Sequence, residues 1–176
     1  MLKTLVKVGE VSNLSDARYC AGMGVEMLGF LLDTEKAISL NDVKEITNWI
    51  EGCKFVAEFK NSTYEEVKHA IEEFSFDFVQ VSDISIAKSL KVEGIGVILE
   101  SNELDVKSLT SIDYVITSKV TSDLTCSIFS GDITLNNLEV LVSQFKGINL
   151  LGGDEIRPGF KDFDELADIL EALEID

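Results

Sequence analysis

The stretch Met27-Leu-Gly-Phe-Leu-Leu32 is a continuous apolar run of strand length, which is typical of a β-strand covered on both faces. The next segment opens with Ser39-Leu-Asn-Asp42, a helix-capping pattern, and then carries apolar residues at helical spacing from Val43 to Ile50. A buried strand followed by an amphipathic helix is the unit from which parallel sheets are built. This stretch therefore predicts an α/β fold with a parallel sheet.

The same unit recurs along the whole chain. The other apolar runs of strand length are Thr4–Val8, Lys54–Phe59, Asp77–Val81, Gly94–Leu99, Tyr114–Thr117, Cys126–Phe129 and Ile148–Leu151. Eight strand–helix units favour a (β/α)8 TIM barrel, with an open doubly wound sheet as the alternative. No linker or low-complexity segment interrupts the 176 residues, so we expect a single barrel domain over residues 1–176.

The chain is short for this fold, whose lower end lies near 200 residues. The shortage falls between Lys119 and Thr125, where Lys-Val-Thr-Ser-Asp-Leu-Thr has room for a turn but not for a helix. We therefore expect a compact barrel with the sixth helix reduced or missing. Further helices are predicted over Glu103–Leu109, from Thr134, and after a capping box at Ser62-Thr-Tyr-Glu65.

Composition excludes several classes of function. The 32 Asp and Glu residues against 15 Lys and Arg give a formal charge of −17, which argues against binding to nucleic acid or to anionic membranes. No apolar segment approaches the ~20 residues of a membrane span, and the start has no long apolar leader, so we expect a cytoplasmic protein. The same acidity mildly disfavours an anionic substrate.

Residues that commonly bind metals or act as nucleophiles are scarce. The single histidine, His69, projects away from the apolar face of its helix, and Cys20, Cys53 and Cys126 have neither disulfide nor zinc spacing. We interpret the three cysteines and Trp49 as packing residues. No motif for a metal or a cofactor is present.

Two glycine-containing loops follow the last two strands. Barrel phosphate sites commonly lie there, where backbone N–H groups bind the anion. Gly131, Gly152 and Gly153 are therefore candidates for binding a phosphate, with Asp132 beside them and Lys7 as a nearby cation. The alternative is that these glycines only form tight turns.

Several segments, in order along the chain, resemble the phosphoribosylanthranilate isomerase family. They are Lys7-Val-Gly-Glu-Val-Ser-Asn13, Gly24-Val-Glu-Met-Leu-Gly-Phe30, Val56-Ala-Glu-Phe-Lys-Asn61, Phe76-Asp-Phe-Val-Gln-Val81 and Gly147-Ile-Asn-Leu-Leu-Gly-Gly-Asp-Glu155. The resemblance implies a TIM barrel without a cofactor. It also implies an Amadori isomerisation of an N-phosphoribosyl aminoaldose in tryptophan biosynthesis, which needs a general base and a general acid.

Both catalytic positions of the family differ in this chain. Gly9 stands where the resemblance places the Cys base, and Ser118 where it places the Asp acid. Lys36 stands in place of an Arg, which keeps the charge but loses the two-pronged hydrogen bonding. The resemblance thus implies a degenerate active site with impaired or lost catalysis, and Glu10 is the candidate for a substitute base.

Three hypotheses follow for the function. The chain is an isomerase that works with altered residues, or a catalytically silent barrel that binds a small phosphorylated sugar, or a protein that binds a protein partner through its acidic surface. The residues for substrate or phosphate binding are Lys7, Lys36, Gly131, Asp132, Gly152 and Gly153. The oligomeric state stays open.

Overall fold

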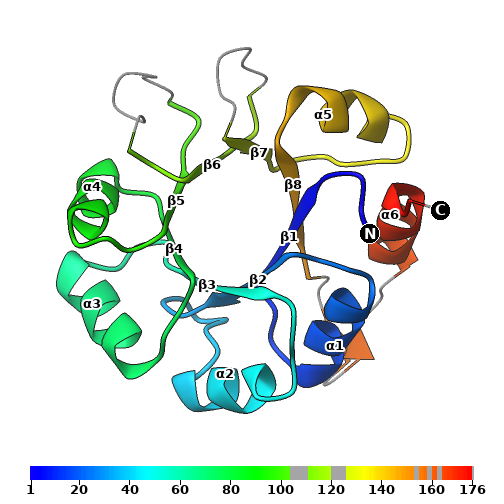
Figure 1. Ribbon diagram of the computed structural model, residues 1–176. Coiled ribbons are helices and arrows are strands. Elements are labelled where there is room, and N and C mark those ends of the chain that lie inside the picture. The colour runs from blue at the N-terminus through cyan, green and yellow to red at the C-terminus, as the bar shows by residue number, and fades with distance from the viewer. Residues whose placement is uncertain (104–110, 120–125, 153–154, 158–159, 162–163, 176) are drawn as a thin grey trace.

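A closed barrel of parallel strands forms the centre of the protein (Figure 1). The computed structural model describes residues 1–176 except 104–110, 120–125, 153–154, 158–159, 162–163 and 176. The barrel strands are β1 (Leu5–Gly9), β2 (Met27–Leu31), β3 (Lys54–Glu58), β4 (Phe78–Val81), β5 (Val97–Glu100), β6 (Tyr114–Thr117), β7 (Ser127–Phe129) and β8 (Gly147–Leu151). Each strand pairs with the next, and β8 pairs with β1 in parallel. The closed ring confirms the predicted TIM barrel and rules out the open sheet.

Helices surround this barrel (Figure 1). They are α1 (Leu14–Gly22), α2 (Leu40–Thr47), α3 (Tyr64–Glu73), α4 (Ile84–Val92), α5 (Leu138–Gln144) and α6 (Asp164–Leu173). The helix predicted over Glu103–Leu109 falls mostly outside the described residues. Only residues 118–126 connect β6 to β7, and 120–125 of these also lie outside the described part. This short connection agrees with a compact barrel whose sixth unit is reduced.

Side-chain caps define where the helices begin. The start of α3 is a capping box in which the Thr63 hydroxyl accepts from the backbone N–H of Glu66, while the Glu66 carboxylate accepts from the backbone of Thr63. The predicted box at Ser62 and Glu65 was therefore wrong by one residue. The physical reason is that Ser62 donates both its N–H and its hydroxyl to Oδ2 of Asp33.

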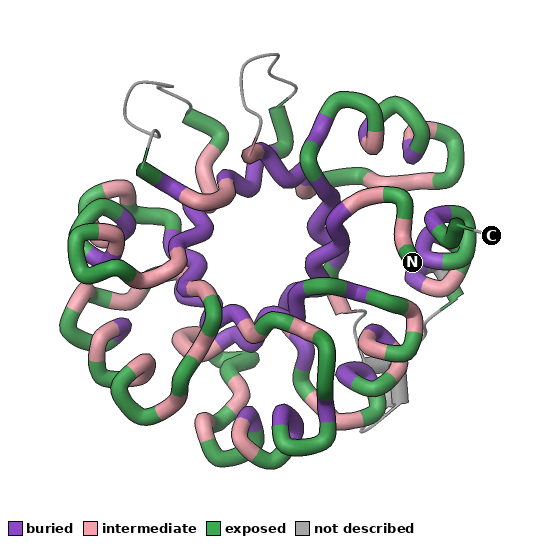
Figure 2. The backbone as a smooth tube through the Cα atoms, in the orientation of Figure 1, coloured by how far each residue is buried: buried purple, intermediate pink, exposed green. Residues whose placement is uncertain are grey.

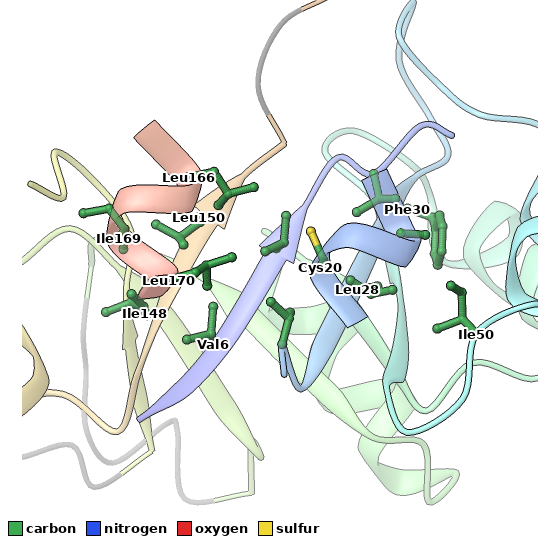
Figure 3. Close-up of a cluster of buried hydrophobic side chains, with 14 of the residues drawn as sticks. Val6, Cys20, Leu28, Phe30, Ile50, Ile148, Leu150, Leu166, Ile169 and Leu170 are labelled. Carbon is green, nitrogen blue, oxygen red and sulfur yellow. The ribbon is translucent and has the colours of Figure 1, made fainter. Parts of the chain in front are cut away.

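The buried residues form the ring of strands, with further buried stretches on the surrounding helices (Figure 2). Below the carboxyl ends of the strands, apolar side chains form a cluster inside the barrel: Leu5, Met27, Val56, Ile98, Ile116 and Ile128. Outside the barrel, the apolar face of α6 packs on β8 and β1, with Leu166, Ile169 and Leu170 near Ile148, Leu150 and Val6 (Figure 3). The polar residues described below therefore sit at the other end of the lumen.

The two ends of the chain meet beside α6. Lys3 donates its N–H to the carbonyl of Leu173 at 2.9 Å, and Ile175 donates to the carbonyl of Met1 at 3.0 Å. Figure 1 shows the labelled termini on the same side of the barrel. These hydrogen bonds attach the last helix to the first strand, next to the β8–β1 seam.

Three observations differ from the sequence-based expectations. A two-stranded hairpin of β9 (Glu155–Arg157) and β10 (Phe160–Lys161), which the apolar pattern did not predict, follows β8. Helix α5 starts at Leu138, several residues after the expected Thr134. Trp49 is 65% exposed, with the guanidinium carbon of Arg18 5.6 Å from the ring centre, so it is not a core packing residue. Arginine side chains stack well on exposed tryptophan rings.

Cys20 is fully buried, as a packing residue should be. Cys53 and Cys126 are half-buried, and burial raises the pKa of each of these two thiols. A raised pKa keeps a thiol protonated at neutral pH, which agrees with the packing interpretation.

Within the described residues, no helix is long and apolar enough to cross a membrane. Likewise, His, Cys, Asp and Glu side chains of the described part form no group of three or more that could hold a metal ion.

Candidate functional site

The carboxyl ends of the strands, where barrel sites normally lie, carry a polar network inside the lumen. Alternation along β1 points Leu5 and Lys7 inward, so Lys7 lies directly above the apolar layer. Lys7 is 0% exposed, and its ammonium donates to Oε1 of Glu58 and, at 2.9 Å, to Oδ1 of Asn149. Asn149 donates in turn to the hydroxyl of Ser130 at 3.1 Å. The network thus joins β1, β3 and β8 to the loop after β7.

Two glycines make the space for this buried ion pair. A β-carbon on Gly9 would lie 2.7 Å from Oε1 of Glu58 and 3.1 Å from Nζ of Lys7. A β-carbon on Gly29 would overlap the same carboxylate, at 2.5 Å from its Cδ. A side chain at either position would force the ends of Glu58 and Lys7 to move. The Lys7–Glu58 pair therefore occupies the volume that a side chain at residue 9 would need.

Above this pair lies a second group of charged residues, at the rim of the barrel. The ammonium of Lys60, just after β3, lies 3.4 Å from Oε2 of Glu100 and 3.9 Å from Oε1 of Glu10. Gln80 of β4 donates its amide N–H to the same Oε2 of Glu100 at 2.9 Å. We call Glu10, Lys60, Gln80 and Glu100 the rim cluster.

Glu10 owes its place in the rim cluster to an unusual backbone conformation. Its φ is 56°, which is in the left-handed region, and its backbone N–H donates to Oε2 of Glu58 at 3.0 Å. A residue other than glycine adopts this conformation only when its surroundings fix it. Because of this conformation, the alternation of inward and outward side chains along β1 does not continue to residue 10. The Glu10 carboxylate instead lies near the ammonium of Lys60.

A hollow of about 300 Å³ adjoins the rim cluster, and Lys60 forms part of its lining. Its apolar lining comes from Phe59, Val81 and Ile86, and Ser82 and Asp83 contribute polar groups. A larger hollow of about 500 Å³ lies between α2 and α3, and Asp33 lines it. The two hollows share the loop that follows β3.

Asp33 organises that loop. Its Oδ2 accepts from the backbone N–H groups of Lys60, Asn61 and Ser62 and from the Ser62 hydroxyl, at 2.6–3.1 Å. Burial alone would raise the pKa of Asp33, but these hydrogen bonds from Asn61, Lys60 and Ser62 outweigh it and lower the pKa below 3.8. Asp33 is therefore a structural carboxylate that fixes the position of Lys60.

The residues predicted for phosphate binding are spread around the barrel. Gly131 and Asp132 are exposed in the loop after β7, while Lys36 is exposed in the loop after β2. Gly152 is half-buried and donates its N–H to the carbonyl of Gly9 at 2.9 Å. Gly153 lies outside the described residues. Lys7 forms part of the network below these loops, with its ammonium bonded to Glu58 and Asn149.

Ser118, at the position of the expected general acid, is exposed. Its hydroxyl and its N–H both bond to Oδ1 of Asn102, at 3.0 and 2.8 Å. This serine ties the loop after β6 to the loop after β5, which is a structural role.

Sequence reasoning missed Glu58, Gln80 and the pairing of Lys60 with Glu100. A signal was present, because Lys7 and Glu58 are charges within otherwise apolar strands. Their inward positions face two glycines in neighbouring strands, Gly9 and Gly29. Charges at inward positions beside glycines indicate a buried ion pair.

Comparisons with models of protein families and with curated proteins find no match. Solved structures match over nearly the whole chain. The phosphoribosylanthranilate isomerase of Thermus thermophilus has a TM-score of 0.78 at 19% identity, covering 96% of this chain and 98% of that one. Its counterpart from Thermotoga maritima has a TM-score of 0.76 at 17% identity, with 97% and 98% covered.

The N-(5'-phosphoribosyl)anthranilate isomerase of Pyrococcus furiosus is similar as well. Its TM-score is 0.74 at 16% identity, and the match covers 97% of this chain and 98% of that one. Three structures from different organisms thus agree along their whole length with the closed barrel described above. The chain has the fold of the phosphoribosylanthranilate isomerases.

Proposed function

We propose that this chain is a divergent phosphoribosylanthranilate isomerase homologue that has lost the isomerisation and binds a small polar ligand at the rim of the barrel. The full-length structural match and the ordered sequence segments support the descent. The polar network at the carboxyl ends of the strands supports ligand binding at the position where barrels of this kind carry their sites.

The observation that carries the loss of catalysis is the Lys7–Glu58 pair beside Gly9. The resemblance places the general base at residue 9, but Gly9 has no side chain, and the ends of Glu58 and Lys7 lie where one would begin. The expected acid position holds Ser118, whose hydroxyl is bonded to Asn102. Removing a general acid or base typically slows a reaction ~10²–10⁴-fold. The loss of both supports a chain that no longer carries out the isomerisation.

We assign Glu10 to ligand binding rather than to the role of the missing base. Its carboxylate faces the ammonium of Lys60, and its backbone N–H bonds to Glu58. Both contacts place Glu10 within the rim cluster, which suits a residue that binds a ligand.

A growth experiment tests this function. The gene is expressed in a bacterial strain that lacks its own isomerase and needs tryptophan to grow, with an active isomerase as the positive control. We expect no growth without tryptophan, although the protein accumulates in folded form. Growth that depends on Glu10 would contradict the proposal.

A further inference from the structure

We propose that the side chain of Lys60 is a gate over the mouth of the barrel, the opening at the carboxyl ends of the strands. In the closed position its ammonium bridges Glu10 and Glu100, and the gate opens when the ammonium releases these two carboxylates. The inference goes beyond the proposed function, because it concerns access to the lumen for any small molecule and does not depend on which ligand binds there.

The bridge spans the mouth from one side to the other. In the closed ring, β5 lies four strands from β1 in either direction, so these two strands stand on opposite sides of the barrel (Figure 1). Glu10 directly follows β1, Glu100 ends β5, and Lys60 follows β3, which lies halfway between them. The Lys60 ammonium is 3.9 Å from Oε1 of Glu10 and 3.4 Å from Oε2 of Glu100. An ammonium that reaches carboxylates from opposite walls lies over the lumen.

Inward side chains next to the bridge are withdrawn from water. Gln80 of β4 donates its amide N–H to the same Oε2 of Glu100 and is only 4% exposed. Leu31, the last residue of β2, pairs in register with Glu58 and is 5% exposed. Alternation along β2 from Met27, which belongs to the apolar cluster inside the barrel, places Leu31 on the inward face as well. The bridge thus lies beside a lumen that is closed to solvent.

One buried atom in this lumen favours opening. The Oε1 of Gln80 has no hydrogen-bond partner among the described residues and is shut off from solvent. A buried acceptor without a donor costs free energy, and water that enters through an open mouth can supply the missing donor. The closed state is therefore held by the bridge against a local cost.

The backbone of Lys60 is anchored, whereas its ammonium is held weakly. The N–H of Lys60 donates to Oδ2 of Asp33 at 2.8 Å. In contrast, the side chains of Glu10, Lys60 and Glu100 are 29%, 33% and 38% exposed, and ion pairs that are open to water contribute little. The ammonium can therefore leave the bridge while the backbone stays in place.

Unfilled space adjoins Lys60 on the outer side of the barrel wall. This is the hollow of about 300 Å³, which Lys60 lines together with Phe59 and Val81, two residues of the apolar layer outside the barrel. A side chain that turns away from the mouth has room there. The gate thus needs only a change of side-chain rotamer.

Chemical labelling of a cysteine inside the lumen tests the gate. Leu31→Cys and, in a separate protein, Gln80→Cys each place a thiol on the inward face beside the bridge. Leu31→Cys removes no hydrogen bond, so it keeps the test valid if Gln80→Cys disturbs the fold. The probe is methyl methanethiosulfonate, which is small and uncharged. Peptide mass spectrometry follows the introduced thiol separately from the three native cysteines, and circular dichroism checks that each variant is folded.

We expect Lys60→Met to speed labelling about fivefold or more at both positions, because methionine keeps a long side chain but cannot pair with the carboxylates. Lys68→Met is the matched control. It removes an ammonium of similar exposure, 27%, that pairs with Glu93 away from the mouth, and it should leave the labelling rate unchanged.

Sodium chloride gives a second readout. Ions screen exposed charge pairs, so salt should speed labelling in the presence of Lys60 and have little effect in the Lys60→Met background. A labelling rate that Lys60→Met leaves unchanged overturns the inference. An equal increase with Lys68→Met, or an effect of salt that persists in the Lys60→Met background, overturns it too, since the bridge then does not control access.

Discussion

At the scale of single residues, the Lys7–Glu58 pair is the feature that most affects both stability and function. Both side chains are almost fully withdrawn from water, at 0% and 2% exposure, and they are satisfied by each other, by Asn149 and by the backbone of Glu10. Burying two charges costs free energy that the pairing offsets only when every partner is in place. Removing one partner is therefore much worse than removing both.

Glu58→Gln should destabilise the protein by about 3–5 kcal/mol, because it leaves the buried ammonium of Lys7 without a counter-charge. Urea unfolding measures this loss. The double variant Lys7→Met with Glu58→Leu should be near neutral or more stable than wild type, since it removes both charges. Glu93→Gln breaks the more exposed pair with Lys68 and should cost at most about 1 kcal/mol. Equal losses for Glu58→Gln and Glu93→Gln would show that the interior pair is not buried as described.

A second prediction at this scale concerns the contribution of Asp33 to stability at different pH. The pKa of Asp33 is lower in the folded protein than its ordinary value of 3.8, because the hydrogen bonds from Asn61, Lys60 and Ser62 outweigh its burial. A lowered pKa contributes stability that is fully present above the ordinary value and is lost as the pH falls from that value through the lowered pKa of the folded protein. Asp33→Asn should thus cost about 1–2 kcal/mol at pH 7, and the difference from wild type should shrink below about pH 4.

Urea unfolding between pH 3 and pH 7 measures this dependence, with Glu35→Gln in the same exposed loop as the control. A difference between Asp33→Asn and wild type that stays constant over the whole range would argue against the hydrogen-bonded carboxylate.

At the scale of elements, Glu58 of β3 determines where β1 and β2 carry glycine. Gly9 and Gly29 lie in the walls of the barrel where a methyl group would meet the Glu58 carboxylate. Glycine is thus favoured at these two positions because of a residue in a different strand. The glycine of β1 is explained only when β3 is considered with it.

Gly29→Ala should therefore cost about 1–3 kcal/mol in the wild-type background, as overpacking of a filled interior does. In a Lys7→Met, Glu58→Ala background the same change should cost much less, because the clash is gone. Thermal unfolding of the four proteins gives the coupling. Gly22→Ala on α1 is the control, since its added methyl meets no atom within 4 Å. Additive effects of Gly29→Ala and the double change would refute this account of the glycines.

At the scale of the whole molecule, the sequence was sufficient for the barrel but not for its site. Apolar runs such as Met27–Leu31 and Tyr114–Thr117 mark strands, because a strand covered on both faces must be apolar throughout. The hairpin after β8 has no such run and was missed. The Lys7–Glu58 pair joins residues 51 positions apart, so only the register of β1, β2 and β3 reveals it. The rim cluster depends likewise on the backbone at Glu10, which local patterns do not indicate.

The charge of −17 makes a prediction for the whole molecule. Self-repulsion destabilises a compact chain of high net charge, and salt screens it. Raising sodium chloride from 20 to 200 mM should raise Tm by about 2–4 °C for each kcal/mol of repulsion removed. Differential scanning calorimetry measures the shift, with sucrose at equal osmolality as the control. A Tm that falls with salt would mean that attractive ion pairs outweigh the repulsion.

The central claim is that the barrel has kept the isomerase fold and lost the isomerase reaction. The most direct test is an assay of the purified protein with the N-phosphoribosyl aminoaldose as substrate, following its conversion to the aminoketose. We predict a rate equal to that of buffer alone, for wild type and for Glu10→Ala and Asp132→Ala alike. Measurable turnover in the wild type that drops in either variant would contradict the account.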